Sequence, residues 1–492
     1  MTETAKKKRG MPSSFTILLA LLAIVAVVTV IVSGTSGGAV TAARLSDFCT
    51  APIKGFADAL PVCLFVMILG GFLGMMTETG ALDNGIAVLV QKLKGNEIML
   101  IPVLMLIFSL GGTTYGMCEE TVPFYALLAA TMMAAGFDPM VGAATVLLGA
   151  GCGCLGSTVN PFAAGAAVDA LTGVDIAVNQ SIIIGLGAVL WLVTTVMSIV
   201  FVMNYAKKVK ADKGSTILSM QELKDAEEAH GKAASEVHKE VKLTGRQKGV
   251  LIAFAFTFVV MIVGFIPLAD LNEGVANFFD AGAVYDADGN AVVQGWSALI
   301  TGLPIGQWYF DEASTWFFLM AILIGIIGGL SEKQIVNTFI TGAADMMSVV
   351  LVIALARGIS VLMASTGLDV FVLDAAANAL AGLSGVIFAP MSFLVYFGLS
   401  FLIPSTSGMA TVSMPIMGPL AVKLGFSPEV MVMIFSAAIG VVNLFTPTSG
   451  AIMGGLALAK IEWTTWLKFA LKLIVALSVV CAVILTVACV LL

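Results

Sequence analysis

The stretch GGTTYGMCEETVPF, residues 111–124, decides the fold of this chain. It lies between two apolar runs, IMLIPVLMLIFSL before it and YALLAATMMAAG after it. Each arm has about 13 to 16 residues, or roughly 20 Å of helix, whereas the hydrocarbon core of a bilayer is about 30 Å thick. Arms this short predict a re-entrant hairpin over residues 97–135, with a tip that stops inside the membrane.

The second half of the chain contains a related stretch, IPSTSGMATVSMPI, at residues 403–416. Other pairs keep nearly the same offset of about 290 residues: GFADAL with GAADMM, TETGALD with ASTGLD, and AAGFDPMVG with KLGFSPEVM. GSTVNP (156–161) and TPTSG (446–450) both interrupt apolar runs, as breaks in a helix do. An offset this long indicates a duplicated half rather than a short structural repeat.

Composition places the chain in a membrane, because 59% of its residues are hydrophobic, 11% are charged and the mean hydropathy is +1.03. We expect an all-α polytopic protein with two inverted repeats, each with a re-entrant hairpin and a broken helix. It should have about nine full spans plus two hairpins. The expected spans are 16–33, 60–77, 140–171 (broken), 181–205, 249–268, 313–330, 346–364, 428–459 (broken) and 466–490, and the second hairpin covers 384–423.

The distribution of charge predicts the topology. Lysine and arginine are concentrated at residues 6–9 and in the segment 206–248, whereas 269–312 has seven acidic residues and neither lysine nor arginine. Basic residues collect on the cytoplasmic side, so we expect a multi-pass protein of the cell inner (cytoplasmic) membrane, with its N-terminus in the cytoplasm and its C-terminus on the extracytoplasmic side. The expected units are a cytosolic N-terminus (1–15), a first repeat (16–205), a cytosolic linker (206–248), an unpaired helix (249–268), an extracytoplasmic loop with a small β-hairpin (269–312) and a second repeat (313–492).

The N-terminus also raises the possibility of a cleaved signal peptide, because a basic segment precedes the apolar run 16–32. The pairing of 16–33 with 313–330 argues instead that this run is retained as a helix of the first repeat.

Four interruptions in apolar segments, paired by symmetry, predict a central polar site, because non-helical backbone at membrane depth is tolerated only against protein or a water-filled cavity. Glu119 and Glu120 lie at the first hairpin tip, where the second has Thr411 and Val412. A glutamate in a first helical turn can simply complement the dipole, but ionisable groups at this depth favour a ligand site. Arg357 could pair with one of the glutamates or bind a substrate carboxylate.

Other functional classes receive less support. The seven cysteines are odd in number and mostly lie in apolar runs, and both histidines, His230 and His238, fall in the polar linker. Thiols such as Cys118 therefore have no evident base, and we expect no enzymatic activity and no cofactor.

The lysines of the linker indicate membrane topology rather than a nucleic-acid site. DADGN in the outer loop has the wrong spacing for calcium.

Three segments, GGTTYGMCEETVPF, LGAGCGCLGSTVNPFAAG and LARGISVLM, resemble the C4-dicarboxylate anaerobic carrier-like group of the ion transporter superfamily. This group includes proteins assigned provisionally as basic amino acid (arginine/ornithine-type) antiporters. The resemblance implies an elevator-type carrier that forms a homodimer in the lipid bilayer. It implies a substrate site made of Thr113, Thr114, Glu119, Glu120, Ser157, Thr158 and Asn160 with Ser405, Thr406, Ser407, Thr446, Thr448 and Ser449, to which the mid-span charge adds Arg357.

The coupling ion is open between H⁺ and Na⁺, and plain exchange is a third alternative. Sodium-coupled relatives carry a Ser-Asn-Thr type triplet at the tips, from which STVN and PSTSG depart; Ser157, Asn160, Ser405 and Thr406 are the candidate sodium ligands. We expect a secondary active transporter of a small charged metabolite, a basic amino acid antiporter in the first place. The alternatives are a proton- or sodium-coupled C4-dicarboxylate carrier and, from another class, an ion channel.

Overall fold

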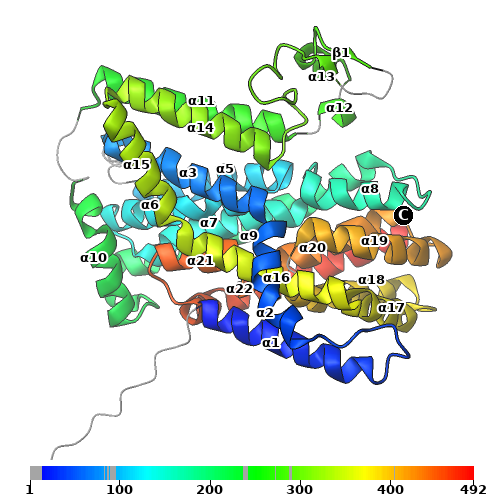
Figure 1. Cartoon of the computed structure of the whole chain (residues 1–492). Helices are drawn as coiled ribbons and strands as arrows, with labels where there is room; N and C mark the ends of the chain where they lie inside the picture. Colours follow the sequence, from blue (N-terminus) through cyan, green and yellow to red (C-terminus); the bar gives the residue numbers. More distant parts are fainter. Residues whose placement is uncertain are drawn as a thin grey trace, which may run out of the picture.

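The computed structural model describes residues 14–82, 84, 85, 88, 96–236, 242–266, 268–271, 273–286, 291–403 and 405–492, and these residues are almost entirely helical (Figure 1). Several features used in the sequence analysis lie outside the described residues. They are the basic N-terminal segment 6–9, His238, the turn 287–290 and Pro404.

The described residues of the first half are mainly helical. They are α1 (Ser14–Ser33), α2 (Leu45–Asp58), α3 (Leu60–Glu78), α5 (Leu100–Tyr115), α6 (Val122–Ala134), α7 (Pro139–Gly156), α8 (Ala166–Thr172) and α9 (Gln180–Ala211), with single turns η1 (Glu97–Met99), η2 (Glu119–Thr121) and η3 (Pro161–Gly165). The segment between the halves contains η4 (Lys213–Ser215), α10 (Met220–Glu236), α11 (Gly245–Phe265), α12 (Leu268–Leu271), α13 (Glu273–Phe279), β1 (Val284–Tyr285) and β2 (Ala291–Val293).

The second half has a similar series of helices. They are α14 (Phe310–Gly328), α15 (Glu332–Asp345), α16 (Met347–Thr366), α17 (Leu368–Leu380), α18 (Gly385–Leu402), α19 (Thr406–Lys423), α20 (Pro428–Val442), α21 (Gly450–Leu458) and α22 (Trp463–Leu491). The two strands pair in antiparallel fashion, Val284 with Val293, within the loop that the sequence analysis places outside the membrane.

Nine helices of the described residues are long and apolar enough to span a membrane, as the sequence analysis expected, although the set differs in two places. The first hairpin arm, Glu97–Tyr115, has 19 residues and qualifies, because α5 continues through residues 111–115 beyond the apolar run. The second arm, α6, has only 13 residues. In the second half, Pro428–Val442 is a shorter apolar helix and the helical break follows it.

The contacts between helices divide most of them into two bundles. In the frame bundle, α2 packs on α16, α3 on α14 and α15, α11 on α14, and α1 on α16. In the hairpin bundle, α5, α6 and α9 pack on α7, and α21 packs on α6. In the same bundle, α18 packs on α20 and α22, α19 packs on α20, and α20 packs on α7. The span containing α7 and α8 is the most enclosed of the nine, because 89% of its most apolar 18-residue stretch is buried. Helix α7 therefore lies at the centre of the molecule.

Local sequence explains where α7 and α20 begin. Asp138 precedes α7, and its carboxylate Oδ1 accepts a hydrogen bond from the Val141 N–H at 3.1 Å; Pro139 occupies the first turn. Ser427 does the same for α20, with the Val430 N–H 3.4 Å from its hydroxyl oxygen. Both are N-caps followed by proline, which fixes the start of each helix.

Glycine permits the closest helix contact in the hairpin bundle, between α5 and α7. A Cβ on Gly112 would lie 2.1 Å from the Ala150 carbonyl oxygen, and a Cβ on Gly153 would lie 2.2 Å from that of Ser109. Since no side chain fits, the two backbones touch directly. This contact fixes the first hairpin arm against the broken helix.

The linker between the halves lies against the hairpin bundle. The Asp138 carboxylate accepts hydrogen bonds from the hydroxyls of Tyr205 (2.5 Å) and Thr216 (2.7 Å). Burial raises the pKa of the Asp138 carboxyl, and these two hydroxyls oppose the shift. In α10, the Glu222 carboxylate accepts from the Glu462 N–H at 3.0 Å, and an imidazole nitrogen of His230 lies 3.1 Å from the Leu458 carbonyl oxygen. Helix α10 thus joins α6, on which it packs, to the turn between α21 and α22.

Candidate functional site

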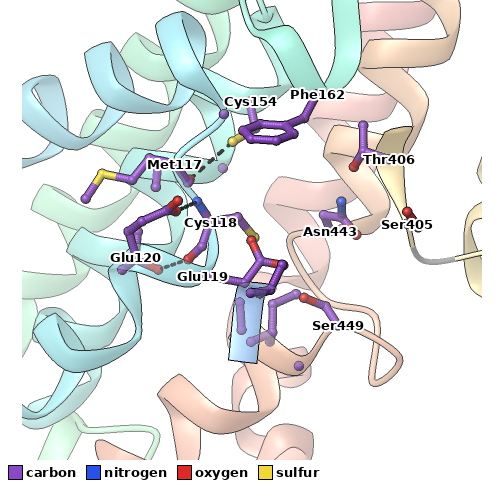
Figure 2. A pocket seen from close by; sticks show the side chains of 18 of the residues that line it. Met117, Cys118, Glu119, Glu120, Cys154, Phe162, Ser405, Thr406, Asn443 and Ser449 are labelled. Carbon is purple, nitrogen blue, oxygen red and sulfur yellow. Dashed lines mark hydrogen bonds between the residues drawn. The ribbon is translucent and has the colours of Figure 1, made fainter. Parts of the chain in front are cut away.

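A cavity of about 160 Å³ lies where the two bundles meet (Figure 2). The hairpin tips and helix breaks of both halves surround it, together with α16 and the start of α14. Nine of the residues expected at the site line it: Glu119, Glu120, Asn160, Arg357, Ser405, Thr406, Ser407, Thr448 and Ser449. The structure therefore brings together side chains that lie up to about 330 positions apart in the chain.

The other five expected residues, Thr113, Thr114, Ser157, Thr158 and Thr446, are not among the residues that line the cavity. Their described contacts are with other parts of the protein. Ser157 and Thr446 are buried, the Ser157 hydroxyl donates to the Cys154 carbonyl, and the Thr114 hydroxyl donates to the Leu110 carbonyl at 2.6 Å. Thr113 and Thr158 are hydrogen-bonded to each other. A substrate contact of any of these five residues stays a prediction.

Two threonines hold the first hairpin tip against the first helix break. The Thr158 hydroxyl donates to the Thr113 carbonyl at 2.9 Å, and the Thr158 N–H donates to the Thr113 hydroxyl oxygen at 3.2 Å. The Val159 N–H also reaches the Thr113 carbonyl, at 3.3 Å. The tip and the break therefore form one unit, in which both irregular segments have partners.

The glutamates follow a left-handed turn at the tip. Helix α5 ends at Tyr115, and Gly116 adopts a φ of 78°, which glycine tolerates without strain. A Cβ there would also lie 2.5 Å from the Asn160 side-chain oxygen, so only glycine fits. The chain then passes through η2, which carries both glutamates, into α6.

Glu119 and Glu120 lie in different surroundings within this turn. Glu120 is 2% exposed, and one of its carboxylate oxygens accepts a hydrogen bond from the Cys118 N–H at 2.9 Å. Glu119 is more exposed, and Figure 2 shows its carboxyl group directed into the space between the two halves. The pair therefore divides into one carboxylate that closes the turn and one that faces the cavity.

Arg357 differs from both sequence-based interpretations. Its Nε lies 3.1 Å from the carboxylate of Asp58, at the end of α2, so its described ion pair is with Asp58 rather than with a glutamate. It is the one basic side chain among the described lining residues. Because Asp58 offsets its charge, the two glutamates in their ionised form would leave the cavity with an excess of negative charge.

In the second half, helix N-termini face the cavity. Ser405 caps α19 by accepting from the Gly408 N–H at 3.1 Å, and Ser449 precedes α21. The hydroxyls of Thr446 and Thr448 lie 2.7 Å apart and bond to each other. The ends of α19 and α21 direct partial positive charge into the cavity, which favours an anionic group there.

The sequence analysis missed several lining residues. Among them are Asn443, Cys154, Phe162 and Phe310, of which Figure 2 shows the first three beside the cavity. The Asn443 side-chain oxygen is buried and has no hydrogen-bond partner among the described residues. An amide inside the apolar run IGVVNLF was a usable signal for Asn443. The two phenylalanines gave none, since rings are common in any membrane helix.

Comparison with known proteins identifies the family. The C4-dicarboxylate anaerobic carrier family matches residues 39–490. The chain belongs to this family. The C4-dicarboxylate anaerobic carrier family is one of membrane transporters, so transport across a membrane is the general function of this chain. This match and the largely helical, membrane-spanning fold confirm the family resemblance and the class of an α-helical polytopic membrane protein, whereas the inverted relation of the repeats stays a prediction.

Two curated relatives match most of this carrier. An uncharacterised protein of Haemophilus influenzae is 28% identical over 445 residues, covering 90% of this chain and 78% of its own length. A protein of Escherichia coli, provisionally named basic amino acid antiporter YfcC, is 27% identical over 440 residues. The match covers 87% of this chain and 77% of YfcC.

Solved structures of transporters are also similar. MtrF of Neisseria gonorrhoeae, described among antimetabolite efflux pumps, has a TM-score of 0.46 and 16% identity, with 98% of this chain and 96% of MtrF covered. The YdaH transporter of Alcanivorax borkumensis has a TM-score of 0.46 and 15% identity, with 97% of this chain and 98% of YdaH covered.

Proposed function

We propose that this carrier exchanges a cationic amino acid of the arginine or ornithine type for a related amino acid or amine. The observation that carries the proposal is the charge of the cavity, in which Glu119 and Glu120 have no free basic partner among the described lining residues. An excess of negative charge attracts a cation and repels a dianion. The provisional name of the Escherichia coli relative supports the same substrate class.

The rest of the cavity suits the other end of an amino acid. Its α-carboxylate would lie at the N-termini of α19 and α21, where Thr406, Ser407 and Ser449 supply hydroxyl donors. Carboxylates on one wall and helix N-termini on another, with a cavity of about 160 Å³ between them, match a short molecule with a cationic side chain at one end and an α-carboxylate at the other. The α-ammonium beside that carboxylate leaves the molecule with a net positive charge.

The proposed mechanism is alternating access of the elevator type. The hairpin bundle carries both hairpin tips and both helix breaks, whereas α16 and α14 of the frame bundle provide one wall. Movement of the hairpin bundle along the frame would carry most of the site with it.

We propose a homodimer in the cell inner membrane, with its N-terminus in the cytoplasm, and either proton coupling or plain exchange. A sodium site at Ser157, Asn160, Ser405 and Thr406 is disfavoured, because a side-chain hydrogen of Asn160 is donated to Ser157 and its oxygen accepts from the Phe162 N–H.

A C4-dicarboxylate carrier is the second candidate, and the family description and Arg357 favour it. In that case Arg357 would leave Asp58 to bind a substrate carboxylate, and the glutamates would be protonated. An ion channel has less support, because residues of both hairpin tips line one common cavity, an arrangement that suits alternating access.

The deciding experiment is exchange in proteoliposomes. Vesicles preloaded with unlabelled arginine or succinate are given the matching radiolabelled compound, with and without a sodium gradient. We expect arginine counterflow that needs no sodium, and no succinate counterflow. Succinate uptake without arginine exchange would replace this proposal with the dicarboxylate reading, and arginine flux that does not require preloaded substrate would refute exchange.

A further inference from the structure

Aromatic rings fill the contact between the hairpin bundle and the frame bundle on the side of the first hairpin. We call these six side chains the aromatic seam: Tyr115, Phe124 and Phe162 from the hairpin bundle, and Phe258, Phe265 and Phe310 from the frame bundle. Each ring of one bundle contacts at least one ring of the other. The seam is thus an interface between the two bodies of the proposed mechanism.

Two pairs in the seam are nearly parallel stacks. The ring centroids of Phe162 and Phe310 are 5.4 Å apart with 24° between the planes, and those of Tyr115 and Phe265 are 5.4 Å apart with 27° between the planes. Such pairs add stability beyond their buried area. Unlike interlocked side chains, parallel rings can also separate along a flat surface without crossing each other.

The seam borders the cavity. Phe162 and Phe310 both line it. Phe265 is the last residue of α11 and Phe310 the first of α14, so these rings lie at the end of the frame from which the 266–309 loop leaves (Figure 1). Phe162 follows the first helix break directly. The stack of Phe162 on Phe310 is therefore the cavity wall nearest that end of the frame.

The seam is also specific to the first half of the sequence. In the pairing of the two halves, Tyr115 corresponds to Ser407, Phe124 to Ile416 and Phe162 to Ile452. The fold therefore does not require a ring at these positions. Contact between the bundles on the other side uses small residues instead, with Gly450 and Gly454 of α21 against Ile353 and Val349 of α16.

We propose that the aromatic seam is a latch between the two bundles, which closes the cavity toward the loop and must separate for the cavity to open on that side. This role rests on the alternating access proposed above but not on the identity of the substrate. Loss of one stacked pair should raise the population of the opened state about two- to tenfold, the range that corresponds to the coupling of an aromatic pair.

The latch is tested by thiol labelling of the full-length carrier in membrane vesicles. Cys154 lines the cavity and serves as the reporter after the other six cysteines are replaced by serine. A membrane-impermeant methanethiosulfonate is added on the loop side, which is identified with a separate Gln294→Cys label in the exposed loop. The rate of Cys154 modification reports opening toward the loop and needs no transported compound.

Phe162→Leu and Phe310→Leu should each increase the labelling rate about two- to tenfold, and the double variant should add little to either single change. Phe310→Tyr keeps the ring and should label at the wild-type rate. The matched control is Phe388→Leu, which removes a stack of 4.8 Å and 29° with Phe426 inside the hairpin bundle and should change nothing.

Unchanged labelling in both leucine variants, or an equal increase in Phe388→Leu, would overturn the latch. If Phe162→Leu does not accumulate in the membrane, Phe124→Leu tests the same interface through its contact with Phe258 at 5.6 Å. The outcome is separate from that of the exchange assay, because a carrier that fails to exchange arginine still reports on the latch through Cys154.

Discussion

At the scale of residues, the two adjacent glutamates have different roles. Glu120 is almost fully buried and its carboxylate binds the Cys118 N–H, so it fixes the hairpin turn. Glu119 faces the cavity and provides the charge that a cationic substrate would meet. The sequence identified both as site candidates, but only the folded turn distinguishes them.

Glu119→Gln and Glu120→Gln, made singly, should each lower arginine exchange by about tenfold or more, since each removes a negative charge from the cavity. Glu120→Gln should in addition lower the thermal stability, because the buried N–H loses a charged acceptor, an effect of about 1–3 kcal/mol. Exchange rates and melting temperatures check both statements. Glu78→Gln, at the end of α3, is the control; equal losses in all three variants would remove the glutamates from the site.

Arg357 marks the limit of sequence reasoning at this scale. Its mid-span position was readable, but its partner was not, because Asp58 lies in the other half and meets it only through the packing of α2 on α16. A contact between helices so far apart in the chain depends on the register of that packing, which the apolar pattern of either helix leaves open.

At the scale of elements, the hairpin and the broken helix behave as one piece. Gly112 and Gly153 bring α5 and α7 into backbone contact, and Thr113 with Thr158 joins the tip to the break. The sequence predicted both irregular elements from their glycine and hydroxyl residues. It underestimated the first arm, since Glu97–Tyr115 gains a turn from residues that are not part of the apolar run.

Gly112→Ala should destabilise the carrier by about 1–3 kcal/mol, because the added methyl group would force α5 away from α7. The measurement is the melting temperature in detergent, together with exchange activity. Gly398→Ala in α18 is the matched control, since a Cβ there meets nothing within 4 Å and alanine is the better helix former. A Gly112→Ala protein as stable as the control would contradict the close contact.

At the scale of the whole molecule, the linker connects the two halves by docking as well as by covalent continuity. Helix α10 packs on α6, while Glu222 and His230 bind the chain around the end of α21. Charge predicted that this segment lies outside the lipid. Its docking site was not readable, because the contacts are to backbone groups that any sequence would offer. The inverted relation of the halves, the unit boundaries and the membrane orientation stay predictions.

Docking of α10 should weaken as the pH falls. Burial lowers the pKa of the His230 imidazole below its ordinary 6.5; the bond to the Leu458 carbonyl opposes the shift, and nearby Lys460 adds to it. Undocked α10 therefore binds more protons than docked α10. The docked state is favoured by this difference above the ordinary pKa of histidine, and it loses that advantage below it. Each further pH unit changes the ratio of docked to undocked α10 by up to about tenfold. Hydrogen exchange of α10 amides at pH 7.5 and 5.5, corrected for intrinsic rates, measures this.

His230→Gln provides the comparison for this pH effect. Glutamine can still donate to the Leu458 carbonyl but does not titrate, so its α10 protection should be much less sensitive to pH. The same loss of protection in wild type and in His230→Gln would assign the pH dependence to other groups.

The separation of charge between the two bundles has a consequence for transport in an energised cell. If the hairpin bundle moves, it carries Glu119 and Glu120, whereas Arg357 and Asp58 stay together in the frame as a neutral pair. Each uncompensated elementary charge that crosses the membrane potential changes the free energy by about 2.3 kcal/mol per 100 mV. An empty hairpin bundle with ionised glutamates is therefore driven by voltage toward the positive side and held there, and a bound cation reduces that bias. Return of the loaded carrier is then favoured over return of the empty one, so voltage itself would enforce one-for-one exchange.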